Sequence, residues 1–136
     1  MAALDKTRLL IAKLAKAIGL KSLPTDDSGG YRLTIGGSTE IFIYGGDDVS
    51  ILVVAPVGPL PRDIEYGLAV YLLRGNLFDA DTAPFQVAVD DGGVLIFWGR
   101  VKIADFDGAR LATLLDLVAA KVGEIRGEIG VEDEAA

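Results

Sequence analysis

The residues of this chain that could do chemistry are carboxylates, and many of them stand in pairs next to glycine. Asp26-Asp27, Asp47-Asp48 and Asp90-Asp91 lie in short polar stretches that contain two glycines each. Asp and Gly together are typical of turns, because Asp accepts hydrogen bonds from nearby backbone amides and Gly tolerates a left-handed backbone. We therefore interpret these pairs as turn residues and not as a catalytic or metal site.

Two further acidic segments are similar to known phosphoryl-transfer motifs. Asp79–Thr82 resembles the start of an aspartyl-phosphate site, but that chemistry needs the first Asp at the end of a buried strand, and here a helix precedes it. As a calcium loop it also fails, because Pro84 replaces the required Gly and Asp90 the clamping Glu. Asp105–Gly108 resembles the magnesium-binding motif of protein kinases, yet the chain is too short for that fold, so helix capping is the better interpretation.

The chain contains no His and no Cys. These are the commonest general base, metal ligand and nucleophile types after the carboxylates, and disulfides are excluded as well. Catalysis by two carboxylates would require both of them across one cleft, and no pattern in the sequence places them there. We therefore predict that the protein is not an enzyme and uses no metal or cofactor.

Size and composition indicate one acidic domain with an excess of apolar residues. The chain has 136 residues, of which 51% are hydrophobic, and a mean hydropathy of +0.40. Such values are high for a small soluble monomer and favour an oligomer or an apolar surface kept for a partner. The net charge of −7 and the pI of about 4.5 argue against nucleic acid as that partner.

We expect a single domain over residues 1–130, followed by a flexible acidic tail at 131–136. No segment is typical of a targeting signal or of a membrane span, because Asp5, Lys13 and Lys16 interrupt the apolar N-terminus. We therefore expect a cytoplasmic protein without stable membrane insertion. Residues 3–18 nevertheless form a basic amphipathic helix, which either packs on the core or lies on a membrane surface as an adaptor.

The predicted elements give an α+β fold with an antiparallel sheet of about five strands and three helices. Their order is α-β-β-β-α-β-β-α. The helices are expected at 3–18, at 61–74 and from Asp105 or Asp107 to about Gly130, and the strands at 31–35, 41–44, 49–55, 85–89 and 94–98.

The helix at 61–74 is apolar over so much of its surface that one sheet cannot cover it. Pro61 suits its first position and Gly75 a left-handed end. A second copy of the chain is the simplest cover, which predicts a homodimer. The residues expected in the dimer interface are Ile64, Leu68, Tyr71 and Leu72.

The two hairpins predict which apolar residues lie on the second face of the sheet. A three-residue turn at 36–38 pairs Leu33 with Ile41 on the core face. In the other hairpin, we expect Val89 to pair with Val94 across the turn at 90–93. The second face would then carry Phe42, Tyr44, Leu52, Val54, Leu95 and Phe97. This face is covered by a dimer mate, by a helix of the same chain or by a bound partner.

With this arrangement of helices and strands, the chain resembles the class I type III secretion chaperones, the Tir chaperone family. The resemblance extends from Leu9 to Arg126 and includes Ile18-Gly19-Leu20, the segment Leu72–Leu77 and the hairpin Phe85–Trp98. It implies a homodimer with the helix 61–74 in its interface. It also implies binding of an extended N-terminal segment of a secreted effector, without ATP or metal.

The same resemblance implies that the effector segment fills apolar patches, for which Phe42, Tyr44, Leu52, Val54, Leu95 and Phe97 are the candidates, and adds a strand to a sheet edge. Holding that segment extended would keep the effector soluble and ready for export. The alternative from the residues alone is a small acidic ligand-binding or adaptor domain.

Overall fold

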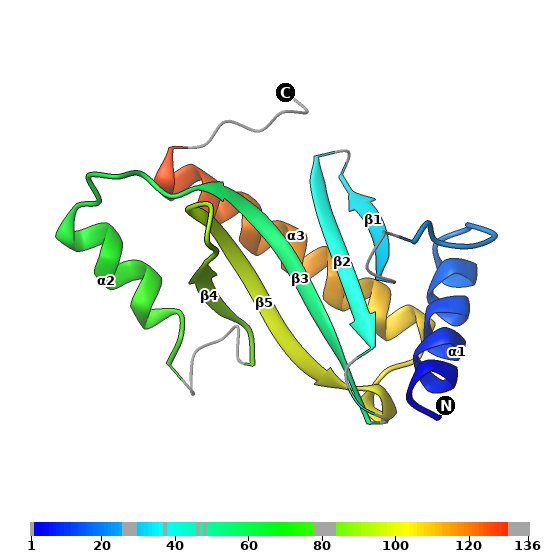
Figure 1. Cartoon of the computed structure of the whole chain (residues 1–136). Coiled ribbons are helices and arrows are strands. Elements are labelled where there is room, and N and C mark those ends of the chain that lie inside the picture. Colours follow the sequence, from blue (N-terminus) through cyan, green and yellow to red (C-terminus); the bar gives the residue numbers. More distant parts are fainter. Residues whose placement is uncertain are drawn as a thin grey trace.

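The computed structural model describes residues 2–25, 30–36, 38–45, 47, 49–77 and 84–130, with the side chains of residues 2–5 left aside. Three α-helices and five strands follow one another in the predicted order (Figure 1). Along the chain they are α1 (Ala2–Ala17), β1 (Tyr31–Ile35), β2 (Thr39–Gly45), β3 (Ser50–Pro59), α2 (Tyr66–Arg74), β4 (Gln86–Val89), β5 (Val94–Lys102), a 3-10 turn (Ile103–Asp105) and α3 (Gly108–Ile129).

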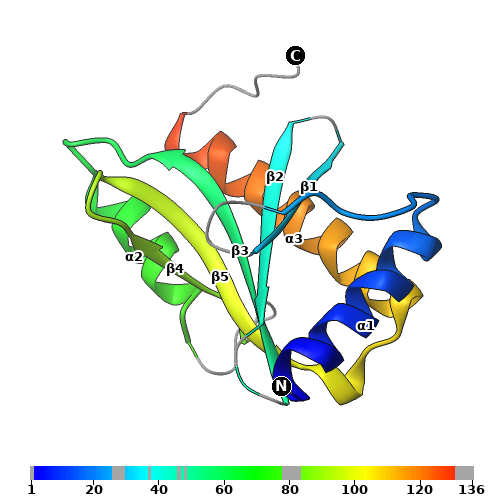
Figure 2. The same cartoon turned by 45° about the vertical axis from the view of Figure 1, so that its right-hand side comes forward.

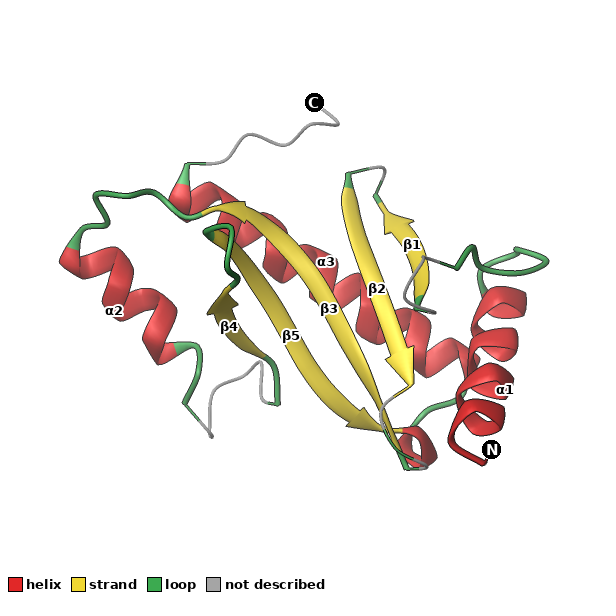
Figure 3. Cartoon of the chain, in the orientation of Figure 1, coloured by secondary structure: helices red, strands yellow, loops and turns green. Residues whose placement is uncertain are grey.

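The five strands form one antiparallel sheet in the order β1-β2-β3-β5-β4. Helices α1 and α3 lie on one face of it, α3 crosses behind the long strands, and α2 lies beyond β4 (Figures 1 and 2). No described helix lies over the opposite face (Figure 3). The core therefore sits between the sheet and α3. It includes Ile41, Ile43, Ile51 and Val53 from the strands, and Leu111, Leu115 and Val122 from the helix.

The first hairpin confirms the predicted register, with Leu33 opposite Ile41 and Tyr31 opposite Ile43. Its three-residue loop begins with Gly36, whose φ of 65° lies in the left-handed region that glycine adopts without strain. Because side chains alternate along a strand, this register places Phe42 and Tyr44 on the face away from the helices.

In the second hairpin, the predicted register is wrong by one residue. Val89 lies opposite Leu95, not Val94. The Asp90 amide donates to the Val94 carbonyl at 3.0 Å, so Asp90 closes the turn and the loop is one residue shorter at that end. Gly93, with φ of 81°, then allows the three-residue loop with its extra residue at the strand start.

This one-residue shift exchanges the two faces of β5. Leu95 and Phe97 are core residues, exposed by only 1% and 3%, so neither lies on the second face as expected. Phe97 stacks on Phe85 with ring centroids 5.1 Å apart. The residues of β5 on the second face are Ile96 and Trp98, both half-buried.

The expected start of the central helix is wrong, and so is the left-handed conformation expected at Gly75, although the helix ends at Arg74 as predicted. β3 continues to Pro59 with β5 as its partner, and the Leu60 amide still donates to the Gly93 carbonyl at 3.0 Å. The helix therefore begins only at Tyr66, and Pro61 lies outside it. Gly75 has φ of −63°, which is right-handed and not left-handed. The amides of Asn76 and Leu77 donate to the carbonyls of Leu73 and Arg74, so the chain continues in tight turns after the helix.

The other helix ends are as predicted. Gly19 follows α1 with φ of 81°, and the Leu20 amide returns to the Ala15 carbonyl at 2.8 Å. Asp107 caps α3 by accepting the Arg110 amide at 2.8 Å. Gly130 ends α3 in a left-handed conformation.

Candidate protein-binding surfaces

The sheet face opposite the helices carries a contiguous apolar patch, which we call the open face. Phe42 on β2 lies opposite Val54 on β3, which lies opposite Trp98 on β5, and Tyr44 lies opposite Leu52. These residues are half-buried although no described helix covers them. The open face consists of Phe42, Tyr44, Leu52, Val54, Ile96 and Trp98.

Four of the six predicted binding residues, all on β2 and β3, thus lie on the open face, and Ile96 and Trp98 replace Leu95 and Phe97. The signal that could have found them is the Gly92-Gly93 pair, since a glycine before the returning strand favours the three-residue loop. An antiparallel sheet face that stays in water is normally polar, so an apolar one indicates a partner.

Polar side chains border the open face. Arg32 lies opposite Phe42, Arg100 opposite Leu52 and Gln86 opposite Trp98, and all three are exposed. An apolar centre with a polar rim is the usual anatomy of a protein–protein interface.

A second surface runs along the outer edge of β1, which we call the edge groove. It encloses about 620 Å³ between β1, the end of α1 and α3. Its apolar wall includes Ile18, Leu20 and Leu23, of which Ile18 and Leu20 are exposed by 37% and 48%. The remaining lining residues are Pro24, Arg32, Leu33, Thr34, Ile35, Gly36, Glu40 and Asp116.

Only the first half of the β1 edge is paired by the described chain. The Arg32 amide donates to the Pro24 carbonyl at 2.9 Å, and Thr25 forms a bridge with Tyr31. Backbone groups alternate in direction along a strand, so those of Thr34 point the same way as those of Arg32, away from β2. Thr34 therefore presents its N–H and C=O to the edge groove.

Helix α2 is attached to the rest of the chain along one side. Leu72 is buried in the core, and Ile64, Leu68 and Tyr71 pack against it. The four residues expected in a dimer interface therefore face their own chain, and their contact with a second copy stays a prediction. The large apolar side chains that α2 and its C-terminal turn leave exposed are Tyr66 (85%), Leu73 (67%) and Leu77 (53%).

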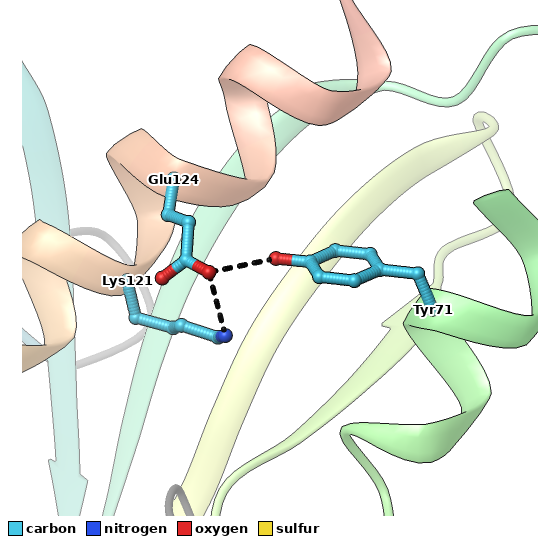
Figure 4. A network of polar contacts seen from close by, with 3 residues as sticks. All are labelled: Tyr71, Lys121 and Glu124. Atoms are coloured by element: carbon cyan, nitrogen blue, oxygen red, sulfur yellow. Dashed lines mark hydrogen bonds and ion pairs between the residues drawn. The ribbon is translucent and has the colours of Figure 1, made fainter.

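A small polar network joins α2 to α3 (Figure 4). The Tyr71 hydroxyl donates to Glu124 Oε1 at 3.2 Å, and Lys121 Nζ lies 3.4 Å from the same oxygen. Lys121 also lies 5.5 Å from the centre of the Tyr71 ring. Burial raises the pKa of the Tyr71 phenol above 10.0, and the Glu124 carboxylate acts in the same direction.

Three of the described acidic residues act on the backbone, whereas Glu124 pairs with the side chains of Tyr71 and Lys121. Asp47, Asp90 and Asp107 accept amide hydrogen bonds in turns or at a helix start. Across the described residues, no group of three or more His, Cys, Asp or Glu could hold a metal ion. Asp26-Asp27, Asp48, Asp79–Thr82 and the expected acidic tail at 131–136 lie outside the described residues.

Among the described helices, none combines the length and the apolar character that crossing a bilayer requires. Helix α1, the candidate membrane-surface element, buries Leu10, Ile11 and Leu14 in the core. Its apolar face is therefore occupied, which supports the core-packing interpretation.

An apolar sheet face that no described helix covers, beside a strand edge that the described chain pairs only in part, is typical of a protein-binding domain. The model of the Tir chaperone protein (CesT) family matches residues 9–126, and the chain belongs to this family. A comparison with curated proteins finds no match.

Solved structures share the fold. A chain in the crystal structure of the Yersinia pestis type III secretion chaperone SycH with a fragment of YscM2 is 22% identical, with a TM-score of 0.71, covering 85% of this chain and 96% of that one. A chain of the ExoU–SpcU complex from the type III secretion system of Pseudomonas aeruginosa is 24% identical, with a TM-score of 0.69 and coverages of 93% and 99%. A chain of the ExsC–ExsE complex is 19% identical, with a TM-score of 0.69 and 97% coverage of both.

Proposed function

We propose that this protein is a type III secretion chaperone that binds an extended N-terminal segment of a secreted effector and keeps it soluble and competent for export. The observation that carries the proposal is the open face, which is apolar, rimmed by polar side chains and covered by no described helix. Family membership and the structural neighbours, which are complexes from type III secretion systems, support it.

The shape of the surfaces favours an extended client over a folded one. The open face is a broad, shallow patch, and the edge groove runs along a strand that still presents the backbone of Thr34. An extended segment can place alternate side chains on such surfaces and pair its backbone with the edge. A folded protein has already paired its own strands and hidden its apolar side chains.

Binding of this kind needs no catalysis, metal or nucleotide, because burial supplies the free energy. A large apolar side chain that becomes fully buried contributes about 1.5–3 kcal/mol. The six residues of the open face, already partly buried, would contribute a fraction of that each. We place this activity in the cytoplasm, before export, where an unfolded client segment needs protection.

We further propose that the working form is a homodimer. Helix α2 and the turn after it expose Tyr66, Leu73 and Leu77, while the other side of α2 packs on its own core. A short helix that is apolar on two sides is stable only when both sides are covered. Two copies would also present two open faces to one client segment.

The test is co-production with the N-terminal segments of proteins that the same secretion system exports. We expect one of them to become soluble and to co-purify with the chain, and Trp98→Asp to abolish this capture because a charge then lies in the apolar patch. Val89→Asp, at a 49% exposed position on the other face of the sheet, is the matched control and should retain capture. Capture by Trp98→Asp at the wild-type level would refute the role of the open face.

A further inference from the structure

Strand addition requires a sheet edge whose backbone groups have no partner. Among the stretches of the described sheet with an unpaired side, three are the outer side of β1, the outer side of β4, and the part of β3 that extends beyond β2. β2 pairs with β3 only from Gly45 opposite Ile51 to Phe42 opposite Val54, and β3 continues to Pro59 with β5 alone. The three stretches differ in what occupies them.

Asn76 occupies the outer edge of β4. Its side-chain oxygen accepts the Val87 amide at 2.6 Å, and its side-chain nitrogen donates to the Val87 carbonyl at 3.1 Å. One amide side chain thus satisfies both outward groups of the residue in the middle of β4, as a neighbouring strand would. Asn76 follows the last residues of α2, so the position of the helix sets the position of this cap.

Arg126 and two prolines occupy the free stretch of β3. Arg126 Nε donates to the Val57 carbonyl at 2.7 Å, and one of its terminal nitrogens lies 3.4 Å from the Pro56 carbonyl. Pro56 and Pro59 have no N–H to offer an added strand. Two acceptors of this stretch are thereby occupied, and two of its residues have no donor to offer.

The outer edge of β1 is capped only at its start. The Pro24 carbonyl accepts a hydrogen bond from the Arg32 amide, but Thr34 lies beyond this contact and borders the apolar wall of the edge groove. An added strand can therefore pair with Thr34 and at the same time bury alternate side chains against Ile18 and Leu20. The other two stretches offer no comparable combination.

We propose that Asn76 and Arg126 restrict where an extended polypeptide can pair with this sheet: they cap the β4 and β3 stretches and leave the outer edge of β1 open to strand addition. The inference rests on the proposed function, in that the polypeptide would be the client segment. It assigns to the two side chains a role in selecting the binding mode, because a strand at β4 would have to displace two hydrogen bonds.

The test uses the full chain labelled for NMR and a synthetic probe peptide of alternating valine and threonine flanked by lysines. With the wild-type protein, the peptide should shift the amide signals of residues 32–36 and leave those of β4 unchanged. With Asn76→Ala, we expect a several-fold faster exchange of the Val87 amide and additional peptide-induced shifts at residues 86–89. Arg126→Met should gain shifts at Val57 and Gly58, to a smaller extent because the prolines remain.

Two further variants keep the result interpretable. Asn76→Asp retains an acceptor for the Val87 amide but loses the donor, so the peptide should shift the β4 signals less than in Asn76→Ala. This variant replaces Asn76→Ala in the test if Asn76→Ala does not fold. Gln86→Ala changes an exposed side chain on the same strand without touching the cap, and it should behave as wild type.

The proposal is overturned if the peptide shifts β4 in the wild type as strongly as β1. It is equally overturned if the folded Asn76 variants gain nothing at β4, or if neither edge responds in any protein. Such a failure is distinguishable from a failure of the proposed function, because that function is tested by capture through Trp98, which lies on neither edge strand.

Discussion

At the scale of single residues, the aspartates next to glycine organise turns. Asp47 Oδ1 accepts the amides of Val49 at 3.0 Å and Ser50 at 2.9 Å, and also the Ser50 hydroxyl at 2.9 Å. Asp90 Oδ1 accepts the amides of Gly92 and Val94 at 2.8 and 2.9 Å. Each carboxylate thus accepts hydrogen bonds from backbone amides that have no backbone acceptor within the turn.

Asp47 makes the stability of the β2–β3 turn dependent on pH. The Val49 amide, followed by the Ser50 hydroxyl, holds the pKa of this carboxyl below 3.8. A carboxyl with a lowered pKa in the folded state stabilises the fold above its ordinary pKa, and this contribution is lost as the pH falls through the folded value. We therefore expect Asp47→Ala to lower the Tm at neutral pH, and the difference from wild type to shrink at pH values below 3.8.

The measurement is thermal unfolding followed by circular dichroism over a pH series. Asp63→Ala removes an exposed carboxylate from the connection between β3 and α2 and is the control. A Tm difference for Asp47→Ala that stays constant into strong acid would contradict the assignment.

At the scale of elements, the register of β4 on β5 decides which side chains are structural and which are available. Leu95 and Phe97 face the helices, and Ile96 and Trp98 face away from them. Gly99 fits the same arrangement, because the Phe85 ring lies where its side chain would be. The short β4 strand is held by Asn76 on one side and β5 on the other.

This register predicts losses of stability of different size for two neighbouring substitutions. Phe97→Ala should lower the free energy of unfolding by about 3–5 kcal/mol, the range for a buried aromatic ring. Trp98→Ala should cost clearly less, because that ring already contacts water. Urea unfolding of the two variants measures the difference, and equal losses would mean that the faces are assigned wrongly.

The crossing of α1 and α3 depends on Gly108. A Cβ atom at this position would collide with the carbonyl oxygen of Lys13, a backbone atom that cannot move aside easily. Gly108→Ala should therefore destabilise the fold by about 1–3 kcal/mol, as overpacking does. Gly123→Ala, on the same helix with nothing within 4 Å, should instead stabilise it by up to about 1 kcal/mol. Unfolding of Gly108→Ala at the wild-type urea concentration would contradict this packing.

At the scale of the whole molecule, the apolar surface is divided among three places: the open face, the edge groove and the outer side of α2. No described helix lies over the open face (Figure 3). In the proposed arrangement, a second copy on the outer side of α2 and a client on the open face can bind at once, because the two surfaces share no residue.

The dimer has its own test. Leu73→Glu places a charge on the outer side of α2 and should convert a dimer into a monomer without unfolding it. Leu9→Glu is the matched control, because Leu9 on α1 is 63% exposed and Leu73 is 67% exposed. Light scattering at micromolar concentration shows whether each variant is a dimer or a monomer. A wild-type monomer, or a dimer that survives Leu73→Glu, would contradict the proposed interface.

By itself, the sequence determined the order of the elements, the two ends of α3 and the first hairpin. Each of these depends on local information: residue periodicity, a capping Asp107, or a glycine at the first position of a short loop. The same local patterns indicated the excess of apolar residues and placed Phe42, Tyr44, Leu52 and Val54 on one face of the sheet. The family came from the resemblance over residues 9–126.

Only the tertiary structure decided the face of β5, the start of α2 and the roles of Asn76 and Arg126. Val94, Leu95, Ile96, Phe97 and Trp98 are all apolar, so alternation cannot say which of them face the core, and a turn that closes at Asp90 instead of Val89 reverses the answer. The start of α2 depends on how far β5 keeps pairing with β3, and the two caps join residues 11 and 69 positions apart. Such contacts are set by the packing of whole elements, which no local pattern records.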